Sequence, residues 1–419
     1  MIVFLEKVRI NTNFSLLNPI VTEPLELMYV KEVLDQEGIE NYVIDTLFEY
    51  FEPVDKTPEL IILTGYNVAE KSIKDRAMEY KRKYKDSKIM VSGVHAQINR
   101  SVFRDKGIDY VYFSQSLETF RSFIKANNKK HIDYFDKENN RWIIGEDDTL
   151  YKNEEISPNR EFYNRIKDST KYIDKRGVSL IKGSHGCPYS CNFCYCRLLN
   201  SSLYIKSDYK NIFDEMNKIN SEYFWIVDDT LFVTRTDAID FIKCSKESSF
   251  RKKIIGYLRA DYIMQNKDLL HELKQCGLDE VIIGFESPDT NTLIEYNKSM
   301  NSNIYEEVVD LLRDAGIDLT ALFIVSPDSS IKDFILLNRF IKRSKIQVYT
   351  LSIMTPLKGT KDYEDNKDRL ITNDPRKFDF LHLVVPSVLP KYIFYSLFYW
   401  SHLRLLKSKR IRKMLRGSL

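Results

Sequence analysis

The chain has 419 residues, 43% of them apolar and 13% aromatic, which is enough for two or three domains that each bury a core. The net charge is +3, but residues 391–419 carry eight Lys or Arg and no acid, which leaves −5 for residues 1–390. No apolar run reaches the roughly 18–20 residues of a bilayer span, and the first residues lack the basic start of a secretory signal, so a membrane-spanning protein is excluded and a cytoplasmic location is expected.

Residues 1–126 alternate strand-like and helix-like patterns, which predicts an open, parallel α/β sheet of Rossmann type. Ligands of such sheets bind beyond the carboxyl ends of the strands. Here those ends are the segments 64–67, 92–95 and 114–116. Strands are expected at 2–5, 42–44, 59–64, 88–92 and 110–113, and helices at 24–38, 71–84 and 117–126.

Residues 127–175 are polar and irregular, and we expect them to form an ordered linker. A second alternation over 176–360 predicts a partial (β/α)6 TIM-like barrel with its active site at the carboxyl ends of the strands. Residues 361–419 are expected to be a short helical, basic region. The barrel strands are expected at 178–181, 224–227, 254–257, 280–284, 319–325 and 347–352, with helices at 267–276, 303–315 and 331–344.

Four of the six cysteines lie within ten residues, directly after the first predicted barrel strand. Cys187, Cys191 and Cys194 have the spacing C-x3-C-x2-C, and thiolates are the protein ligands of iron–sulfur clusters. Three thiolates on one loop leave a fourth iron open for a substrate or cofactor. The alternative is a structural zinc loop, but a second C-x2-C or a His pair is missing and His185 is badly placed for a closed tetrahedral set. The spacing therefore favours an iron–sulfur centre with an open coordination site.

The cysteine loop, with the aromatic Phe193 before its last cysteine, resembles the signature of the radical S-adenosylmethionine (SAM) superfamily. This resemblance implies a [4Fe-4S] cluster held by the three cysteines, with SAM on the open iron. It also implies reductive cleavage of SAM to methionine and a 5′-deoxyadenosyl radical, which abstracts hydrogen from an unreactive C–H bond. Further segments similar to the family's strand-end motifs are 224–232, 258–261 ("R-x-D"), 284–287 ("G-x-E-S", followed by Asn297-Lys298) and 356–360.

The strand-end residues of these motifs are the expected SAM contacts. Carboxylates such as Glu286 can accept hydrogen bonds from the ammonium or hydroxyl groups of SAM, and Arg259 can pair with its carboxylate. The alternative is that these side chains cap helices or hold the barrel mouth together. Cys196 is expected to be a free thiol, because SAM would occupy the fourth iron. The full set of expected contacts is Phe193, Asp228, Asp229, Arg259, Glu286 and Ser287.

The N-terminal domain resembles the cobalamin-binding domain of the cobalamin-dependent radical SAM subfamily, in segments 23–29, 92–96 and 107–111. It departs at 113–118, where the family has "G-E-G-E" and only Glu118 remains. The resemblance implies cobalamin as a cofactor and methylation of an unactivated carbon; His95 need not ligate cobalt. The expected cobalamin contacts are Thr64, Gly65, Ser92, Gly93, His95 and Glu118.

Two other interpretations stay open. The N-terminal domain can lack cobalamin, which makes the protein a radical SAM oxidoreductase, cyclase or mutase. The chain can also be a non-catalytic metal-sensing or binding module, against which the strand-end motifs argue.

The expected partners are a small-molecule, lipid or peptide substrate and a reductant such as flavodoxin or ferredoxin; no nucleic-acid partner is expected. The aromatic and basic segment 391–419 is compatible with a peripheral contact on an anionic membrane. The favoured alternative is an aromatic helix packed on the barrel, followed by a solvated basic end.

Overall fold

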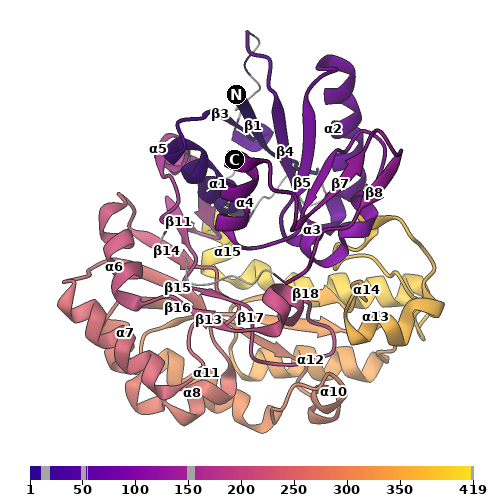
Figure 1. The fold of residues 1–419 in the computed structure, drawn as a ribbon. Coiled ribbons are helices and arrows are strands. Elements are labelled where there is room, and N and C mark those ends of the chain that lie inside the picture. The colour runs from indigo at the N-terminus through magenta and orange to yellow at the C-terminus, as the bar shows by residue number, and fades with distance from the viewer. Residues whose placement is uncertain (11–18, 49–52, 54, 149–155, 417–419) are drawn as a thin grey trace.

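Two large parallel sheets organise the computed structural model, which describes residues 1–10, 19–48, 53, 55–148 and 156–416. In Figure 1 the sheet of the N-terminal part, coloured indigo to purple, lies above the magenta-to-orange barrel. Glu23 joins the two parts: its buried carboxylate accepts hydrogen bonds from the backbone N–H of Leu180 (2.8 Å) and from the hydroxyl of Ser179 (3.0 Å), both on the first barrel strand.

The first sheet has seven strands in the order β3-β1-β4-β5-β6-β7-β8. The central β4 is wholly buried and points Leu60 and Ile62 into one hydrophobic cluster and Ile61 and Leu63 into another. Helices therefore cover both faces, as in doubly wound folds. The parallel strands are β1 (Ile2–Lys7), β3 (Glu40–Ile44), β4 (Leu60–Thr64), β5 (Lys88–Ser92) and β6 (Tyr110–Tyr112); α1 (Leu25–Gln36) and α4 (Leu117–Ala126) cover one face, and α2 (Glu70–Lys83) and α3 (Val94–Asn99) the other.

The barrel is an open six-stranded parallel sheet, β11-β14-β15-β16-β17-β18, as predicted. Its strands are β11 (Val178–Ile181), β14 (Tyr223–Ile226), β15 (Lys253–Tyr257), β16 (Leu278–Glu286), β17 (Asp318–Val325) and β18 (Val348–Ile353). The helices between them are α6 (Tyr209–Lys218), α7 (Arg235–Glu247), α8 (Ala260–Gln265), α9 (Leu270–Gln275), α10 (Thr290–Glu295), α11 (Tyr305–Asp314) and α12 (Ile331–Arg343).

Residues 127–175, expected as an irregular linker, contain regular structure. β7 (Ile132–Asp136) and β8 (Arg141–Ile143) extend the first sheet antiparallel, so this sheet continues past residue 126. The remaining elements here are α5 (Glu161–Ile166), β9 (Lys171–Tyr172) and β10 (Lys175–Arg176), and β9 pairs with β2 (Ile20–Val21). The domain boundaries themselves stay a prediction.

The C-terminal region is helical, with α13 (Lys361–Asn366), α14 (Lys391–His402) and α15 (Lys409–Arg416). The basic end is only partly solvated, because α15 closes the amino-terminal end of the barrel. Met414 packs there against Ile255, Ile282 and Val348 from three barrel strands. Arg410 binds the fully buried Glu280 of β16, with Nη2 and Oε2 2.7 Å apart. Within the described ranges, no helix is long and apolar enough to cross a bilayer.

Candidate active site

The cysteine loop begins after β11 and the short β12 (Ser184–His185). Gly186 starts it in the left-handed region (φ 77°), and a Cβ there would lie 2.3 Å from the carbonyl oxygen of Leu203. Neighbouring backbone holds the middle of the loop: the N–H of Asn192 donates to the carbonyl of Tyr296 at 3.0 Å. The segment between Cys187 and Cys194 therefore has a fixed path without regular secondary structure.

The three cysteine thiols share one partly buried environment. Burial raises the pKa of the Cys187 thiol to about 11, and Asp229, Cys194 and Cys191 add to that shift. The part of the chain that the structure describes has no group of three His, Cys, Asp or Glu side chains placed around a single ion. Ligands of one ion, at metal–sulfur distances of about 2.3 Å, lie about 4 Å apart, whereas each cysteine of a cluster binds its own iron. Three thiols on one loop are the arrangement that a multi-iron cluster requires.

The two acids after β14 have different surroundings. Asp228 is buried, its pKa is raised by that burial, and its Oδ1 accepts the backbone N–H of Gly183 at 2.7 Å, so it ties β11 to β14. Asp229 lies beside Cys187, Cys194 and Cys196, and its Oδ2 is buried without a hydrogen-bond partner among the described residues. Asp229 is therefore the acid of the pair that is placed to accept a hydrogen bond from a ligand.

Arg259 contacts the cysteine loop through an aromatic ring. Its guanidinium lies 4.0 Å from the ring centroid of Tyr189 and pairs with the carboxylate of Asp261, with Nη2 and Oδ2 2.8 Å apart. This side chain is already engaged on two sides, which supports the alternative that Arg259 helps to hold the barrel mouth together.

Glu286 ends β16 in a left-handed conformation (φ 58°), which is uncommon for a residue with a side chain. Its Oε1 lies 2.6 Å from Nζ of Lys298, and this ammonium also donates to the carbonyl of Gly284 at 2.6 Å. A Cβ on Gly284 would lie 2.2 Å from Glu286 Oε1, so any side chain at 284 would displace this carboxylate from its present position. The hydroxyl of Ser287 accepts the N–H of Asp289 at 3.1 Å and starts the next turn.

A small cavity of about 190 Å³ adjoins the loop at Phe193, whose ring packs edge-on against Tyr296 (centroids 5.5 Å apart). The Tyr296 hydroxyl and Oδ2 of Asp362 are buried there without a hydrogen-bond partner in the described residues. Burial raises the pKa of Asp362 to about 6. Neither Tyr296 nor Asp362 belongs to the motifs that identify the strand ends, so the sequence did not indicate them.

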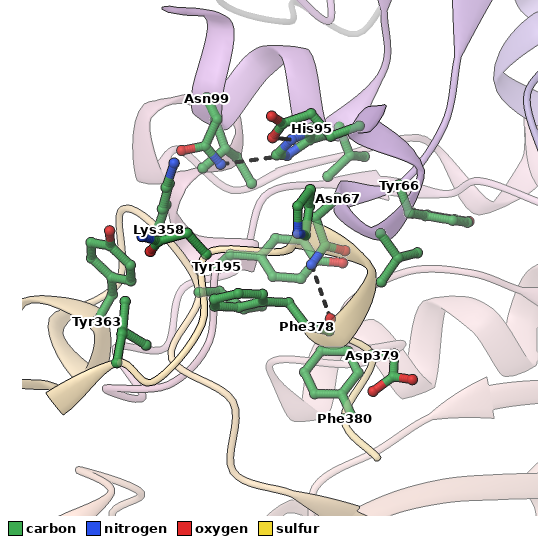
Figure 2. Close-up of a pocket in the computed structure, with 18 residues that line it drawn as sticks. Tyr66, Asn67, His95, Asn99, Tyr195, Lys358, Tyr363, Phe378, Asp379 and Phe380 are labelled. Carbon is green, nitrogen blue, oxygen red and sulfur yellow. Dashed lines mark hydrogen bonds and ion pairs between the residues drawn. The ribbon is translucent and has the colours of Figure 1, made fainter. Parts of the chain in front are cut away.

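A larger cavity of about 530 Å³ lies where the carboxyl ends of both sheets meet. Figure 2 shows Tyr66, Asn67, His95 and Asn99 from the N-terminal part on one side of it, and Tyr195, which follows Cys194, from the barrel. Phe378 and Phe380 of the C-terminal region complete the wall, and the amide of Asn67 donates to the Phe378 carbonyl at 3.1 Å. Most of the exposed lining is apolar.

Of the six expected cobalamin contacts, His95 lines this cavity. Its Nε2 bonds Glu70 at 3.0 Å, and its ring packs edge-on against Phe103. The glycines at the strand ends serve the packing of the domain itself: a Cβ on Gly93 would lie 2.3 Å from the Thr64 hydroxyl, and one on Gly65 would lie 3.0 Å from Ile73. Ser92 is buried at the end of β5, and Glu118 is exposed in the first turn of α4 beside Arg121.

Comparison with known proteins agrees with this geometry. A family model described as the radical SAM superfamily matches residues 181–341, which include the cysteine loop and β14 to β17. These residues form a radical SAM domain. The prediction of a radical SAM domain is thereby confirmed, and such domains use a [4Fe-4S] cluster and SAM. The match ends before β18 and leaves the N-terminal sheet outside it.

Relatives and solved structures extend the similarity beyond the radical SAM domain. The hopanoid C-3 methylase of Methylococcus capsulatus is 26% identical over 216 residues, which are 52% of this chain and 42% of the methylase. The chain spans about half the length of the curated relatives it matches.

Two solved structures confirm the predicted fold. The cobalamin-dependent radical SAM enzyme OxsB, with aqua-cobalamin and SAM bound, has a TM-score of 0.67 at 19% identity and covers 90% of this chain and 56% of OxsB. The radical SAM methyltransferase TsrM from Kitasatospora setae, with cobalamin and a [4Fe-4S] cluster bound, has a TM-score of 0.67 at 13% identity and covers 97% of this chain and 88% of TsrM.

Proposed function

We propose that this protein is a cobalamin-dependent radical SAM enzyme that transfers a methyl group to an unactivated carbon. The observation that carries the proposal is the 530 Å³ cavity on which the carboxyl ends of both sheets open. Tyr195 of its wall follows the cluster cysteine Cys194 directly, so a molecule in the cavity lies against the cluster loop. The methylase relative and the cobalamin-bound OxsB fold support the same function.

The cluster ligands in this proposal are Cys187, Cys191 and Cys194. When bound, the cluster supplies the electron that cleaves SAM, and cobalamin carries the methyl group. Asp229 has a buried carboxylate oxygen without a partner in the described residues, and it accepts a hydrogen bond from the ammonium or a ribose hydroxyl of SAM. Asp228 and Arg259, already engaged with Gly183 and with Tyr189 and Asp261, hold the barrel mouth in place.

Glu286 and Phe193 complete the SAM contacts. The ammonium of Lys298 keeps the Glu286 carboxylate in place at 2.6 Å, and the buried pair presents one charged edge to the site. Phe193 and the small cavity beside it offer an aromatic wall and unpartnered polar atoms, as the adenine ring of SAM requires. The barrel and the C-terminal region exclude water around these groups.

In this proposal His95 helps to hold the wall of the cavity in place. Its ring nitrogens face Glu70 at 3.0 Å and the Asn99 amide at 3.5 Å, so the imidazole is held by its own domain. The largely apolar lining of the cavity favours an apolar region of a small-molecule or lipid substrate. The electron that the cluster supplies to SAM comes from a reductant such as flavodoxin or ferredoxin.

Anaerobic reconstitution tests the proposal directly. The protein is loaded with iron, sulfide and hydroxocobalamin, desalted, and examined by absorbance; bound corrin bands are expected beside the cluster shoulder. Ile98→Trp fills the cavity and is expected to keep the cluster and lose the corrin, whereas Ile294→Trp, at an exposed position, keeps both. A cluster without corrin in the unmodified protein would reject cobalamin dependence and leave an oxidoreductase, cyclase or mutase.

A further inference from the structure

The helix α14 is apolar on two opposite sides, and only one of them is covered. Phe394 and Phe398 are fully buried, and Phe394 packs edge-on against Phe334 of α12 with centroids 5.4 Å apart. The opposite side is open. Tyr392, Tyr399 and Trp400 of α14 lie there, with Val388 just before the helix and Leu403 and Leu406 just after it, and each of the six is between 47% and 73% exposed.

The open side forms one continuous stripe. Tyr392, Tyr399, Leu403 and Leu406 follow one another at spacings of seven, four and three residues, which places them on the same face of a helix. The stripe runs from α14 into the 3₁₀ turn η10 (Leu403–Lys407). Tyr and Trp are the side chains that favour a membrane–water interface, because each combines an apolar ring with a polar atom.

Cations border this stripe. A groove of about 400 Å³ between α12 and the α14–η10 segment is lined by Trp400 and Leu403 together with Arg339, Lys342, Arg404 and Lys407. Among the described residues, none of these four cations forms an ion pair with a carboxylate. Their neighbours differ: Arg343 pairs with Glu306, and Arg410 pairs with Glu280. The groove has no acidic lining residue.

We propose that the stripe and its four cations dock this protein onto an anionic lipid bilayer. The aromatic and leucine side chains enter the interface, and the guanidinium and ammonium groups bind lipid phosphates from its edge. This surface narrows the segment 391–419 suggested by the sequence to the part before α15 and adds Arg339 and Lys342 of α12, because α15 is committed to closing the barrel through Arg410 and Met414. The proposal is independent of the methyl-transfer function.

Vesicle flotation of the full chain tests the surface. The protein is expected to float with vesicles of phosphatidylcholine and phosphatidylglycerol and to stay at the bottom with phosphatidylcholine alone. Each cation near an anionic surface contributes about 1 kcal/mol, or about fivefold. Replacing Arg339, Lys342, Arg404 and Lys407 with Gln is therefore expected to weaken partitioning several hundred-fold. Raising the salt to about 1 M, where the Debye length is about 3 Å, should release the protein.

The matched control removes four exposed positive charges from the N-terminal domain, at Lys71, Arg82, Lys85 and Lys106, and should bind almost as the unmodified protein does. The variant W400S/L403S/L406S keeps every charge and is expected to lose flotation as well. Circular dichroism and cluster content check that the variants are folded. Equal binding of the groove and control variants would overturn the proposal. So would a protein that binds no vesicles and instead forms a dimer that only W400S/L403S/L406S dissociates.

Discussion

His185 and Gln115 form a hydrogen bond between the barrel and the N-terminal sheet, with Nδ1 and Oε1 2.8 Å apart. Gln115 uses its amide nitrogen to donate to Gln97 at 2.9 Å, so its oxygen is turned toward the imidazole. Burial, with help from Lys182, lowers the pKa of His185 to about 3, so the ring is neutral and Nδ1–H is the donor. The residue two positions before Cys187 is thus fixed by the other domain.

Gln115→Leu should destabilise the protein by about 1 kcal/mol, because it removes this acceptor without replacing its hydrogen bond. Urea unfolding measures the effect. Gln275→Leu, at an exposed amide at the end of α9, is the control and should change the free energy of unfolding by less than about 0.5 kcal/mol. Equal values for the two variants would show that the bond between the domains contributes nothing.

Gly284→Ala should weaken SAM binding at least about tenfold, which corresponds to about 1.4 kcal/mol. The added methyl group would lie 2.2 Å from Glu286 Oε1 and 2.8 Å from Lys298 Nζ, so this ion pair must move. Equilibrium dialysis with labelled SAM on cluster-loaded protein gives the affinity. Lys298→Met, which removes the partner and leaves Gly284 in place, should produce a loss of the same kind; unchanged affinity in both would remove the Glu286–Lys298 pair from the SAM site.

Arg410→Met should cost about 3–5 kcal/mol of unfolding free energy, because it removes a partner from the buried Glu280 carboxylate. Arg412→Met, on the exposed side of the same helix, should change it by less than about 0.5 kcal/mol. Denaturant unfolding of the two variants side by side separates the buried cation from the solvated one. A small effect of Arg410→Met would mean that Lys175, 2.7 Å from Glu280, is a sufficient partner.

Asp362→Asn should stabilise the protein at pH 7, because burial raises the pKa of this carboxyl from 3.8 to about 6. The native state keeps the proton that the unfolded state has lost, so the wild-type protein loses stability as the pH rises from about 4 to 6. The difference corresponds to about 3 kcal/mol at most, at 1.36 kcal/mol per pH unit. The gain of the variant should vanish below pH 4, whereas Asp214→Asn, at an exposed position on α6, should show no such dependence.

Cys191→Ala should abolish the cluster, whereas Cys196→Ala should retain it. Iron and sulfide content after anaerobic reconstitution, with electron paramagnetic resonance of the reduced proteins, distinguishes the two. Equal iron contents would mean that the ligand set is not Cys187, Cys191 and Cys194.

Local patterns account for the elements that the sequence predicted most closely. The predicted bounds 117–126 of α4 coincide with the structure, because Ser116 caps the first turn through the N–H of Thr119 and Asn127 ends the helix at φ 51°. The predicted strand 178–181 also coincides with β11, because a short apolar run before a glycine-rich loop can form few other structures.

Contacts between distant residues could not be predicted in this way. Arg410 and Glu280 are 130 positions apart, and the basic run around Arg410 has the same appearance in sequence whether it is solvated or buried. The linker strands β7 and β8 are only five and three residues long, so only the pairing of β7 with β6 and of β8 with β7 shows them. The motifs located the strand ends of the candidate active site. They did not indicate that Arg259 is paired with Asp261, or that one carboxylate oxygen of Asp229 has no partner in the described residues.

The position of α15 sets the order in which the protein matures. A ribosome makes the barrel strands long before it makes Arg410, and domains fold as units during synthesis. Until α15 has been made, Glu280 lacks its guanidinium partner and the lower barrel interior is open to water. The barrel core is therefore complete only after all six strands and α15 have been synthesised, and a substitution in α15 acts on the same core as one in the strands.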